Sequence, residues 1–203
     1  MQNKYSDKYP LVLLSIYTII WIILAIKPKY RSVWIDENIL VFLFLIIILV
    51  SYKKFRLSNT SYTYLFIFMV LHSIGAHYSY SEMPLFDILK ENFKFQRNHY
   101  DRLIHFLFGV LWFFPTLDIL TKFGKIKKGI FVIIVTILII SGFKGIFEVI
   151  EYLYTLIRNS GLTTSNYLGE QGDSLDALKD IGLGIFGAVL SGLYYGIKSK
   201  IKK

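Results

Sequence analysis

The chain has no cysteine and is poor in proline and in charged residues. Its 203 residues include four prolines, and Asp, Glu, Lys and Arg together make up 18% of them, against roughly 25% in soluble domains. The absence of cysteine excludes disulfides and thiolate chemistry. No run alternates apolar and polar residues as the strands of a membrane barrel do, and no internal repeat or low-complexity tract is evident.

Apolar residues are abundant instead. They make up 54% of the chain, and the mean hydropathy is +0.50. A helical span needs about 20 mostly apolar residues, so the sequence predicts an all-α, polytopic membrane bundle that forms one integral-membrane domain over residues 1–203. The first apolar run ends in "IKPKY" without a small-residue cleavage site, which favours a retained anchor over a signal peptide. The six predicted spans are residues 10–26, 35–52, 61–80, 103–121, 129–156 and 177–197.

The formal net charge of +9 does not indicate a nucleic-acid partner, because the lysines form short clusters between apolar runs. Such clusters are typical of the cytoplasmic rim of a membrane protein. They are densest near the N-terminus, in the second and fourth loops and in the C-terminal tail, so both termini are predicted to be cytoplasmic. The clusters are Lys4 and Lys8; Lys53, Lys54 and Arg56; Lys122, Lys125, Lys127 and Lys128; and Lys198, Lys200, Lys202 and Lys203.

Ionisable residues gather at the opposite, outward ends of the last four spans. Such residues are costly at membrane depth and normally face a bundle interior or a watery cavity, so we expect one outward-opening polar pocket. Helical spacing brings some of them onto shared faces: Asp101 with His105, and Lys144 with Glu148 and Glu151. The contributing residues are His72, His77, His99, Asp101, His105, Glu148, Glu151, Asp173, Asp176 and Asp180.

Each of these patterns has a structural alternative. Lys144 and Glu148 are also typical of a buried ion pair that has no further role. Asp101 and His105 are also typical of a helix cap beside a hydrogen-bonded histidine. His72 is also typical of a satisfied core histidine. The presence of all of them at one membrane face favours a pocket.

The pocket predicts two kinds of chemistry. His105, oriented by Asp101, is a candidate general base, with Glu148 or Glu151 as the acid and Asp176 and Asp180 completing the site. Alternatively, a divalent metal ion (zinc, manganese or magnesium) is bound there. The candidate metal ligands are His77, His99, His105 and Asp173. No HExxH, rhomboid-like serine or lipid-phosphatase histidine motif is present.

Two further segments have clear patterns. Residues 81–102 form an interfacial loop with a short amphipathic helix, in which Leu85, Ile88, Leu89 and Phe93 are apolar; it is either a lid or a connector. In the last span, Gly192 and Gly196 have GxxxG spacing. This spacing predicts close helix packing, within the bundle or in a homodimer.

The blocks "HSIGAHYSYSEMP", "RNHYDRLIHFLFG", "FEVIEY" and "LGEQGDSLDALKDIGLGIFGA" resemble the YjdF family of bacterial inner-membrane proteins, whose biochemical function is unassigned. The resemblance covers about residues 60–197 and implies a multi-pass protein of the bacterial cytoplasmic membrane. More distantly, "DRLIHF", "EVIE" and "DALKD" look like VanZ-type proteins, which are linked to glycopeptide resistance. That similarity puts Asp101, His105, Glu148, Asp176 and Asp180 at motif positions. Arg102, Glu151 and Asp180 depart from it, where the family has Lys, Gln and Asn.

Three functions remain open on these grounds. The first is an integral-membrane enzyme that acts on a lipid or cell-envelope substrate at the outer leaflet. The second is a carrier for a small solute or an ion. The third is a non-catalytic envelope factor that affects antibiotic susceptibility. The bilayer is the partner in every case.

Overall fold

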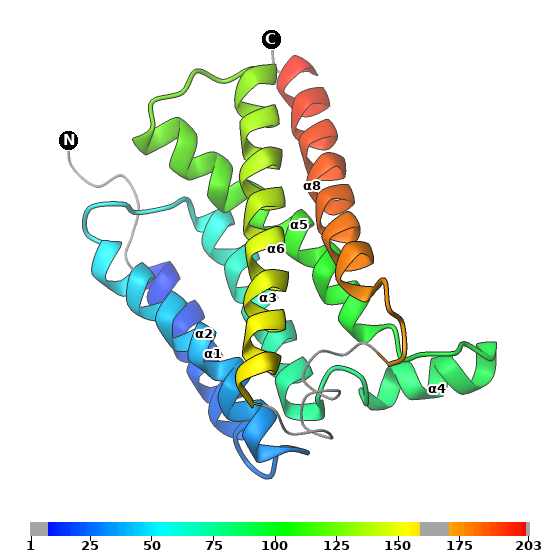
Figure 1. Cartoon of the computed structure of the whole chain (residues 1–203). Coiled ribbons are helices and arrows are strands. Elements are labelled where there is room, and N and C mark those ends of the chain that lie inside the picture. Colours follow the sequence, from blue (N-terminus) through cyan, green and yellow to red (C-terminus); the bar gives the residue numbers. More distant parts are fainter. Residues whose placement is uncertain (1–7, 159–170, 202–203) are drawn as a thin grey trace.

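The computed structural model describes residues 8–158 and 171–201, and all regular structure in these ranges is helical (Figure 1). A helix lies over each of the six predicted spans, and a short helix lies within residues 81–102. A five-residue π-helical turn, η1, extends α5. The elements are α1 (Lys8–Leu24), α2 (Arg31–Ser51), α3 (Asn59–Tyr78), α4 (Pro84–Phe93), α5 (Tyr100–Asp118), η1 (Ile119–Phe123), α6 (Ile130–Arg158) and α8 (Asp176–Ile201).

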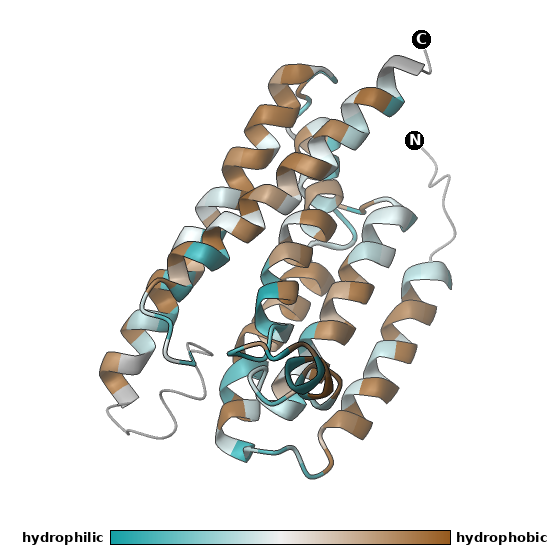
Figure 2. Ribbon diagram, turned by 90° about the vertical axis from the view of Figure 1, so that its right-hand side faces the viewer, coloured by the Kyte–Doolittle hydropathy of each residue, from teal (hydrophilic) through white to brown (hydrophobic). Residues whose placement is uncertain are grey.

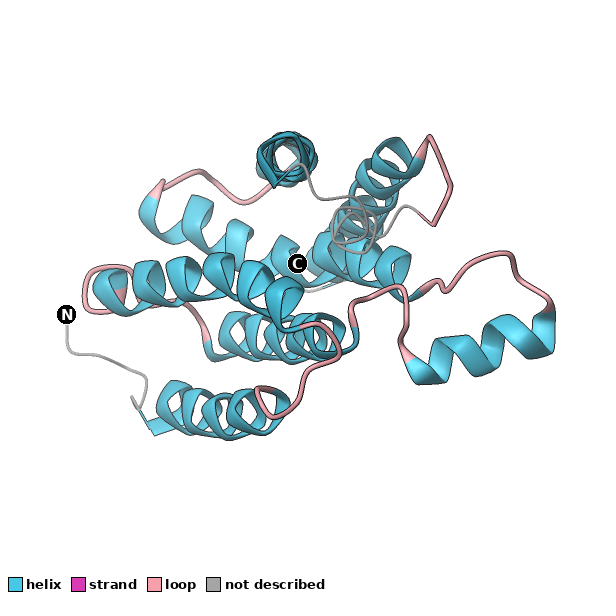
Figure 3. Cartoon of the chain, turned by 60° about the horizontal axis from the view of Figure 1, so that its bottom comes forward, coloured by secondary structure: helices cyan, strands magenta, loops and turns pink. Residues whose placement is uncertain are grey.

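Helix α5 is the centre of the bundle. It packs against α3, α6 and α8, while α1 and α2 pack on α3 and α6 also packs on α8. The short helix α4 projects from one end of the bundle, as Figures 1 and 3 show from two directions. The start of α5 and the start of α8 lie at the same end as α4, and the first turns of these two helices carry Asp101, His105, Asp176 and Asp180.

Four helices are long and apolar enough to cross a membrane. They are α2, α5 together with η1, α6 over Ile130–Tyr154 and α8 over Asp176–Ser199; α1 is a shorter apolar helix of 17 residues. Apolar ribbon dominates the long helices, and polar ribbon gathers toward the end at which α4 lies (Figure 2). Many large apolar side chains on α1, α2, α6 and α8 are exposed. A surface of this kind suits lipid rather than water.

Small residues let α8 approach α5 and α6 closely. A Cβ atom on Gly109 of α5 would lie 1.9 Å from the carbonyl oxygen of Gly184, and one on Gly187 would lie 2.3 Å from the carbonyl oxygen of Phe106. Gly192 makes room for Ile133 of α6. The glycine face of the last helix therefore packs within the bundle, which was one of the two predicted meanings of its spacing.

A single carboxylate joins the start of α3 to the end of α5. Asp118 Oδ2 accepts hydrogen bonds from Ser58 N and Ser61 Oγ, both at 2.8 Å. Ser58 is also the N-cap of α3, and its hydroxyl accepts a bond from Ser61 N. Caps of this kind satisfy amide groups that have no partner within the helix. The end of the bundle opposite α4 is thereby fixed.

Candidate functional site

A buried polar group occupies the place where α5, α6 and α8 meet. His105 Nε2 lies 3.0 Å from Asp101 Oδ1, one turn earlier on α5. On the other side of the ring, Lys144 Nζ of α6 hydrogen-bonds to His105 Nδ1, and the same ammonium bonds to Glu148 Oε1 at 2.6 Å. Asp180 of α8 places Oδ2 4.0 Å from His105 Nε2. We refer to these five residues as the inner group.

Space for Lys144 in the inner group comes from a glycine. A Cβ atom on Gly184 of α8 would lie 2.8 Å from Cγ of Lys144, so the lysine stem crosses α8 where that helix has no side chain. The ammonium is thereby held beside His105. The spacing of four residues along α6 predicts that Lys144 and Glu148 share one face. The packing of α6 against α8 turns that face toward α5.

The inner group carries more negative than positive charge. Asp101, His105, Lys144 and Asp180 are buried, and the side chain of Glu148 is 9% exposed. Three carboxylates therefore share one ammonium and one imidazole. In addition, Asp101 Oδ2 and Asp180 Oδ1 are buried without a hydrogen-bond partner among the described residues. Buried carboxylate oxygens in this condition are costly unless a cation or a proton satisfies them.

Three members of the inner group are arranged as metal ligands. Asp101, His105 and Asp180 each offer one ligand atom, and these atoms lie within 4.8 Å of one another. One imidazole nitrogen and two carboxylate oxygens are a donor set that suits zinc or manganese. Asp101 and Asp180 are also the two residues that each have a buried carboxylate oxygen without a hydrogen-bond partner, so the residues fit a divalent cation.

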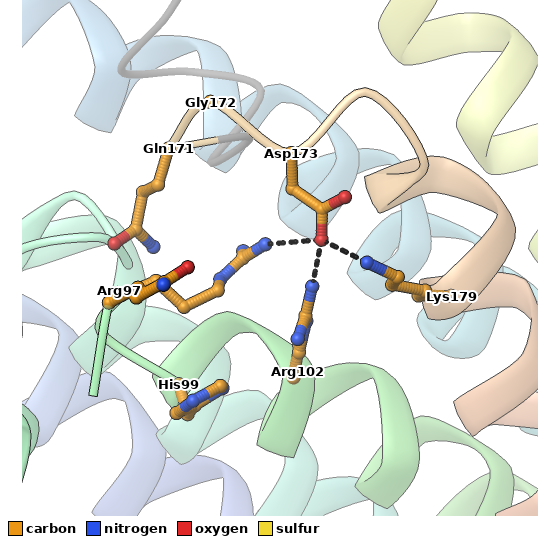
Figure 4. A pocket seen from close by; sticks show the side chains of 8 residues that line it. Arg97, His99, Arg102, Gln171, Gly172, Asp173 and Lys179 are labelled. Atoms are coloured by element: carbon orange, nitrogen blue, oxygen red, sulfur yellow. Dashed lines mark hydrogen bonds and ion pairs between the residues drawn. The ribbon is translucent and has the colours of Figure 1, made fainter.

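A second, more exposed set of charges lies nearer the starts of α5 and α8 than the inner group does. We refer to Arg97, Arg102, Asp173, Asp176 and Lys179 as the outer group. Asp173 Oδ2 is the meeting point: it bonds to Arg102, lies 2.5 Å from Lys179 Nζ and lies 3.7 Å from an Arg97 nitrogen (Figure 4). The hydrogen bond from Lys179, aided by Arg102, lowers the pKa of Asp173 to about 2. The outer group has three cations and two carboxylates, so its charge is opposite to that of the inner group.

Arg97 connects the two groups. Its guanidinium bonds to Asp176 Oδ1 and lies 3.7 Å from Asp101 Oδ2. The side chain is 7% exposed, so this contact is buried. One buried arginine is therefore shared by carboxylates of the inner and the outer group.

Asn98 fixes the backbone around both groups. Its side chain donates to Met83 O and Asp87 Oδ1, and its backbone amide and carbonyl form a reciprocal pair with the side chain of Gln171. Asn98 Oδ1 also accepts from Tyr100 N at the start of α5. One fully buried residue thus joins α4, α5 and the segment before α8.

The structure brings some predicted residues together and leaves others apart. Asp101, His105, Glu148, Asp176 and Asp180 lie in the inner and outer groups, joined by the contacts given above. Glu151 is within electrostatic range of Glu148 and Asp101 but has no described hydrogen bond.

The predicted metal set of His77, His99, His105 and Asp173 is not assembled. His77 Nδ1 lies 2.7 Å from Leu24 O. His99 lies beside Arg97 and Arg102 of the outer group, where burial and these two arginines lower its pKa. Asp173 lies before α8, which begins at Asp176. Within the described ranges, the one group of three or more metal-binding side chains is Asp101, His105 and Asp180.

Sequence reasoning missed the polar residues of α2. Asp36, Glu37 and Asn38 are buried although they lie near the start of an apolar helix. The carbonyl oxygen of Glu37 lies 3.4 Å from His72 Nε2, and His72 Nδ1 lies 2.5 Å from the Tyr80 hydroxyl. The available signal was "IDEN", two acids and an amide at the start of an otherwise apolar run.

Comparisons with known proteins agree with this description of a membrane bundle. The model of the family described as "Predicted membrane protein (DUF2238)" matches residues 9–200. Among curated proteins, the inner membrane protein YjdF of Escherichia coli (strain K12) is 24% identical over 177 residues, which are 87% of this chain and 84% of that relative. No solved structure matches significantly. The chain belongs to the DUF2238 family of predicted membrane proteins.

Proposed function

We propose that this chain is a multi-pass protein of the bacterial cytoplasmic membrane that binds a divalent metal ion through Asp101, His105 and Asp180 and acts on a lipid or cell-envelope substrate. The observation that carries the proposal is the buried donor set itself: three ligand atoms within 4.8 Å, on two helices, with one oxygen of each carboxylate lacking a hydrogen-bond partner. All of the residues proposed for the site lie on the described part of the chain.

The charge of the inner group supports a dication rather than a closed set of salt bridges. Asp101, Glu148 and Asp180 supply three negative charges, and Lys144 supplies one positive charge. Burying an ion without compensation costs several kcal/mol in real proteins. A divalent cation would balance the two remaining charges. Arg97 also lies 3.7 Å from Asp101 Oδ2, but its guanidinium is already paired with Asp176. Glu148 lies 3.6 Å from the other ring nitrogen, Nδ1 of His105, and is therefore placed to orient the ring.

In this proposal, the six helices that lie over the predicted spans all cross the membrane, with both termini on the cytoplasmic side. The inner and outer groups then face the exterior, because they lie at the end of the bundle that carries α4 (Figure 1). The amphipathic helix α4, whose Leu85, Ile88 and Phe93 are exposed, lies in the membrane interface. A C-terminal reporter that is active only in the cytoplasm supports this orientation, and one active only outside overturns it.

Metal content is the direct test. Full-length protein, purified in detergent, is incubated with zinc, manganese or magnesium, desalted, and analysed by inductively coupled plasma mass spectrometry. We expect one ion per chain for one of these metals. Removing one of three ligands in Asp180→Asn or Asp101→Asn weakens binding at least tenfold, since even the loss of a residue that only hydrogen-bonds to a ligand costs about ten- to a hundredfold.

Glu91→Gln is the matched control, because it also converts a carboxylate to an amide but lies on the exposed face of α4. It leaves the metal content unchanged. Size exclusion and circular dichroism establish that each variant is folded. A wild-type protein that retains no ion, or a folded Asp180→Asn variant that binds as the wild type does, rules the metal site out.

Ion transport is a second candidate, favoured by the buried residues of α2. Glu37 is 5% exposed and lies within electrostatic range of Asp101. Together with His72 and Tyr80 it extends the polar interior from α5 toward α2 and α3. Proton or cation flux into liposomes containing the purified chain tests this function, with Glu37→Gln as the variant. Flux that is absent from wild-type liposomes eliminates it.

A non-catalytic envelope role follows from the distant likeness to VanZ-type proteins. In that role the polar groups are structural, and replacing them matters only through folding. Alanine at His105, Glu148 or Asp176 separates the roles. Loss of a cellular phenotype, such as glycopeptide susceptibility, at normal expression and with normal unfolding eliminates the purely structural role.

A homodimer through the last helix is also retained as a proposal. The face available for it carries Phe186, Leu190 and Leu193, which are exposed. Gly184, Gly187 and Gly192 face α5 and α6 instead. Crosslinking through cysteines introduced at these positions tests it, because the chain has no cysteine of its own.

A further inference from the structure

A hollow of about 430 Å³ lies between the start of α5 and the start of α8. Its wall includes Arg97, His99, Arg102, Gln171, Asp173 and Lys179. Figure 4 shows the nitrogen atoms of two arginines and one lysine directed at a single oxygen of Asp173. Three cations that converge on one point form an environment for an anion, and here one acidic side chain occupies that point.

We infer that this hollow binds the phosphate group of a membrane lipid or lipid-linked precursor, with the Asp173 carboxylate holding the three cations in place in the absence of that ligand. The inference rests on the proposed function and deepens it, because it names the charged part of the substrate. The carboxylate uses Oδ2 for Arg102 and Lys179 and Oδ1 for the amide of Leu175.

The cations of the outer group match the geometry of phosphate. A guanidinium offers five donors in a planar fork, and an ammonium offers three. Asp173 supplies one oxygen to three cationic side chains, whereas a phosphate monoester supplies three outer oxygens. A phosphate can therefore replace the hydrogen bonds of Arg102 and Lys179 to Asp173 and the 3.7 Å ion pair of Arg97, and it offers an acceptor oxygen to each of the three cations.

Apolar residues beside the hollow point to a lipid as the source of the phosphate. Phe93 and Phe95 stack with ring centroids 5.6 Å apart, and Phe95 meets the edge of His99 at 5.2 Å. Both phenylalanines are exposed, and His99 lies on the wall of the hollow. A basic hollow bordered by exposed aromatic rings is suited to an amphiphile, with its phosphate among the cations and its chains along the rings.

The position of the hollow connects it to the proposed metal site. Arg97 contacts Asp173 on one side and lies 3.7 Å from Asp101 Oδ2 on the other. A phosphate that displaces Asp173 therefore shares an arginine with a proposed metal ligand. Cationic side chains and a divalent metal ion on one phosphate are the recurring parts of phosphoryl-group sites.

Binding to metal-free protein tests the inference apart from the proposed function. The full-length chain is treated with EDTA, placed in phosphatidylcholine nanodiscs and titrated with phosphatidic acid, using native mass spectrometry to count bound lipid. We expect one tightly bound phosphatidic acid per chain. Arg102→Gln weakens binding about tenfold, because it removes a charged donor. Asp173→Asn strengthens binding severalfold, because it removes the competing carboxylate.

Lys94→Gln is the matched control, since it removes one positive charge from an exposed residue just after α4 and outside the hollow. It leaves the affinity unchanged. Arg102→Lys retains the charge without the planar fork, so we expect it to recover part of the affinity. It is also the variant to use if Arg102→Gln is poorly folded. Equal affinity in wild type, Arg102→Gln and Asp173→Asn overturns the inference, as does absence of stoichiometric binding.

A parallel titration with inorganic phosphate distinguishes the source of the anion. Inorganic phosphate that binds as tightly as phosphatidic acid, with the same dependence on Arg102 and Asp173, supports a phosphate site and overturns the lipid assignment. The Asp180→Asn variant separates the two proposals. If it loses metal but binds phosphatidic acid normally, both sites stand; if the wild type binds lipid and no metal, the metal proposal fails alone.

Discussion

Lys144 donates a hydrogen bond from its ammonium to Nδ1 of His105 in the buried centre of the bundle. An ammonium has donors and no acceptor, so Nδ1 carries no proton in this arrangement. The ring proton is then on Nε2, which donates to Asp101 Oδ1 at 3.0 Å. If His105 held a metal ion through Nε2, its ring proton would lie on Nδ1, and the partner of Nδ1 would be Glu148 rather than Lys144.

Replacing Lys144 by Met is therefore predicted to tighten metal binding about tenfold. The change removes a positive charge beside the site and frees Nδ1 of His105 to donate to Glu148, 3.6 Å away. Competition with a chromophoric zinc chelator measures the affinity. Lys198→Met, on the exposed end of α8, is the control. A weaker affinity in Lys144→Met means that the ammonium shapes the site rather than competing with the metal.

Gly109→Ala is predicted to destabilise the protein by about 2–3 kcal/mol, the cost typical of overpacking a core. Its new Cβ meets the backbone of α8, 1.9 Å from Gly184 O, and neither helix can give way easily. Gly182→Ala is the matched change on α8, with nothing within 4 Å of the new methyl group. Alanine in an open helix position adds up to about 1 kcal/mol. Reversible unfolding in mixed micelles measures both variants, and effects of the same sign contradict the packing described here.

Glu82→Gln is predicted to have an effect that depends on pH. Burial opposes ionisation of Glu82, but hydrogen bonds from Lys29 and Tyr30 outweigh it, so its pKa is lowered from the ordinary 4.5; the same pair raises the pKa of Lys29 from 10.5. The ion pair between Glu82 and Lys29 therefore stabilises the native state in full between pH 4.5 and pH 10.5, the ordinary pKa values of the two groups. It is lost as the pH falls through the lowered pKa of Glu82 or rises through the raised pKa of Lys29.

The size of this effect is small, because the pair is partly exposed. We expect Glu82→Gln to lower the free energy of unfolding by about 0.5 kcal/mol at pH 7, and the difference from wild type to shrink below pH 4.5. High salt reduces it as well. A difference that stays constant from pH 7 to pH 3 shows that the ion pair with Lys29 contributes nothing.

Asp118→Ala is predicted to cost about 1–3 kcal/mol, because Ser58 N and Ser61 Oγ lose their shared acceptor. Asp118→Asn keeps an acceptor oxygen and costs less. Thermal unfolding of the two variants in detergent gives the comparison. If alanine and asparagine cost the same, the negative charge rather than the hydrogen bonds ties α3 to α5.

Apolar runs predicted the helices well because the bilayer requires them. Inside a bilayer no water is available to hydrogen-bond the backbone, so an apolar segment must pair its own amide and carbonyl groups as a helix. A helix accordingly lies over each predicted span. The pairs Asp101–His105 and Lys144–Glu148 were equally accessible, since spacing of four residues along a helix brings side chains together. Contacts between residues on the same helix can therefore be predicted from their spacing in the sequence.

Contacts between different helices were harder to predict from the sequence. The metal-ligand prediction chose His77 and His99 because they are histidines near one membrane face, but rotation about the helix axis turns His77 toward Leu24. Arg97 was not selected, although it joins Asp101, Asp173 and Asp176, because its role depends on how α8 meets the loop before α5. The acids of α2 were missed because nothing in "IDEN" tells which neighbour covers it.

Asn98 has a mechanical consequence for entry to the polar interior. Its bonds to Met83, Asp87 and Gln171 join the approach on the α4 side to the approach on the α8 side. Neither flank can swing open alone without breaking hydrogen bonds of a fully buried amide. Admission of a bulky molecule on either side therefore breaks hydrogen bonds of Asn98, and amide exchange at Asn98 and Tyr100 should report how often this happens.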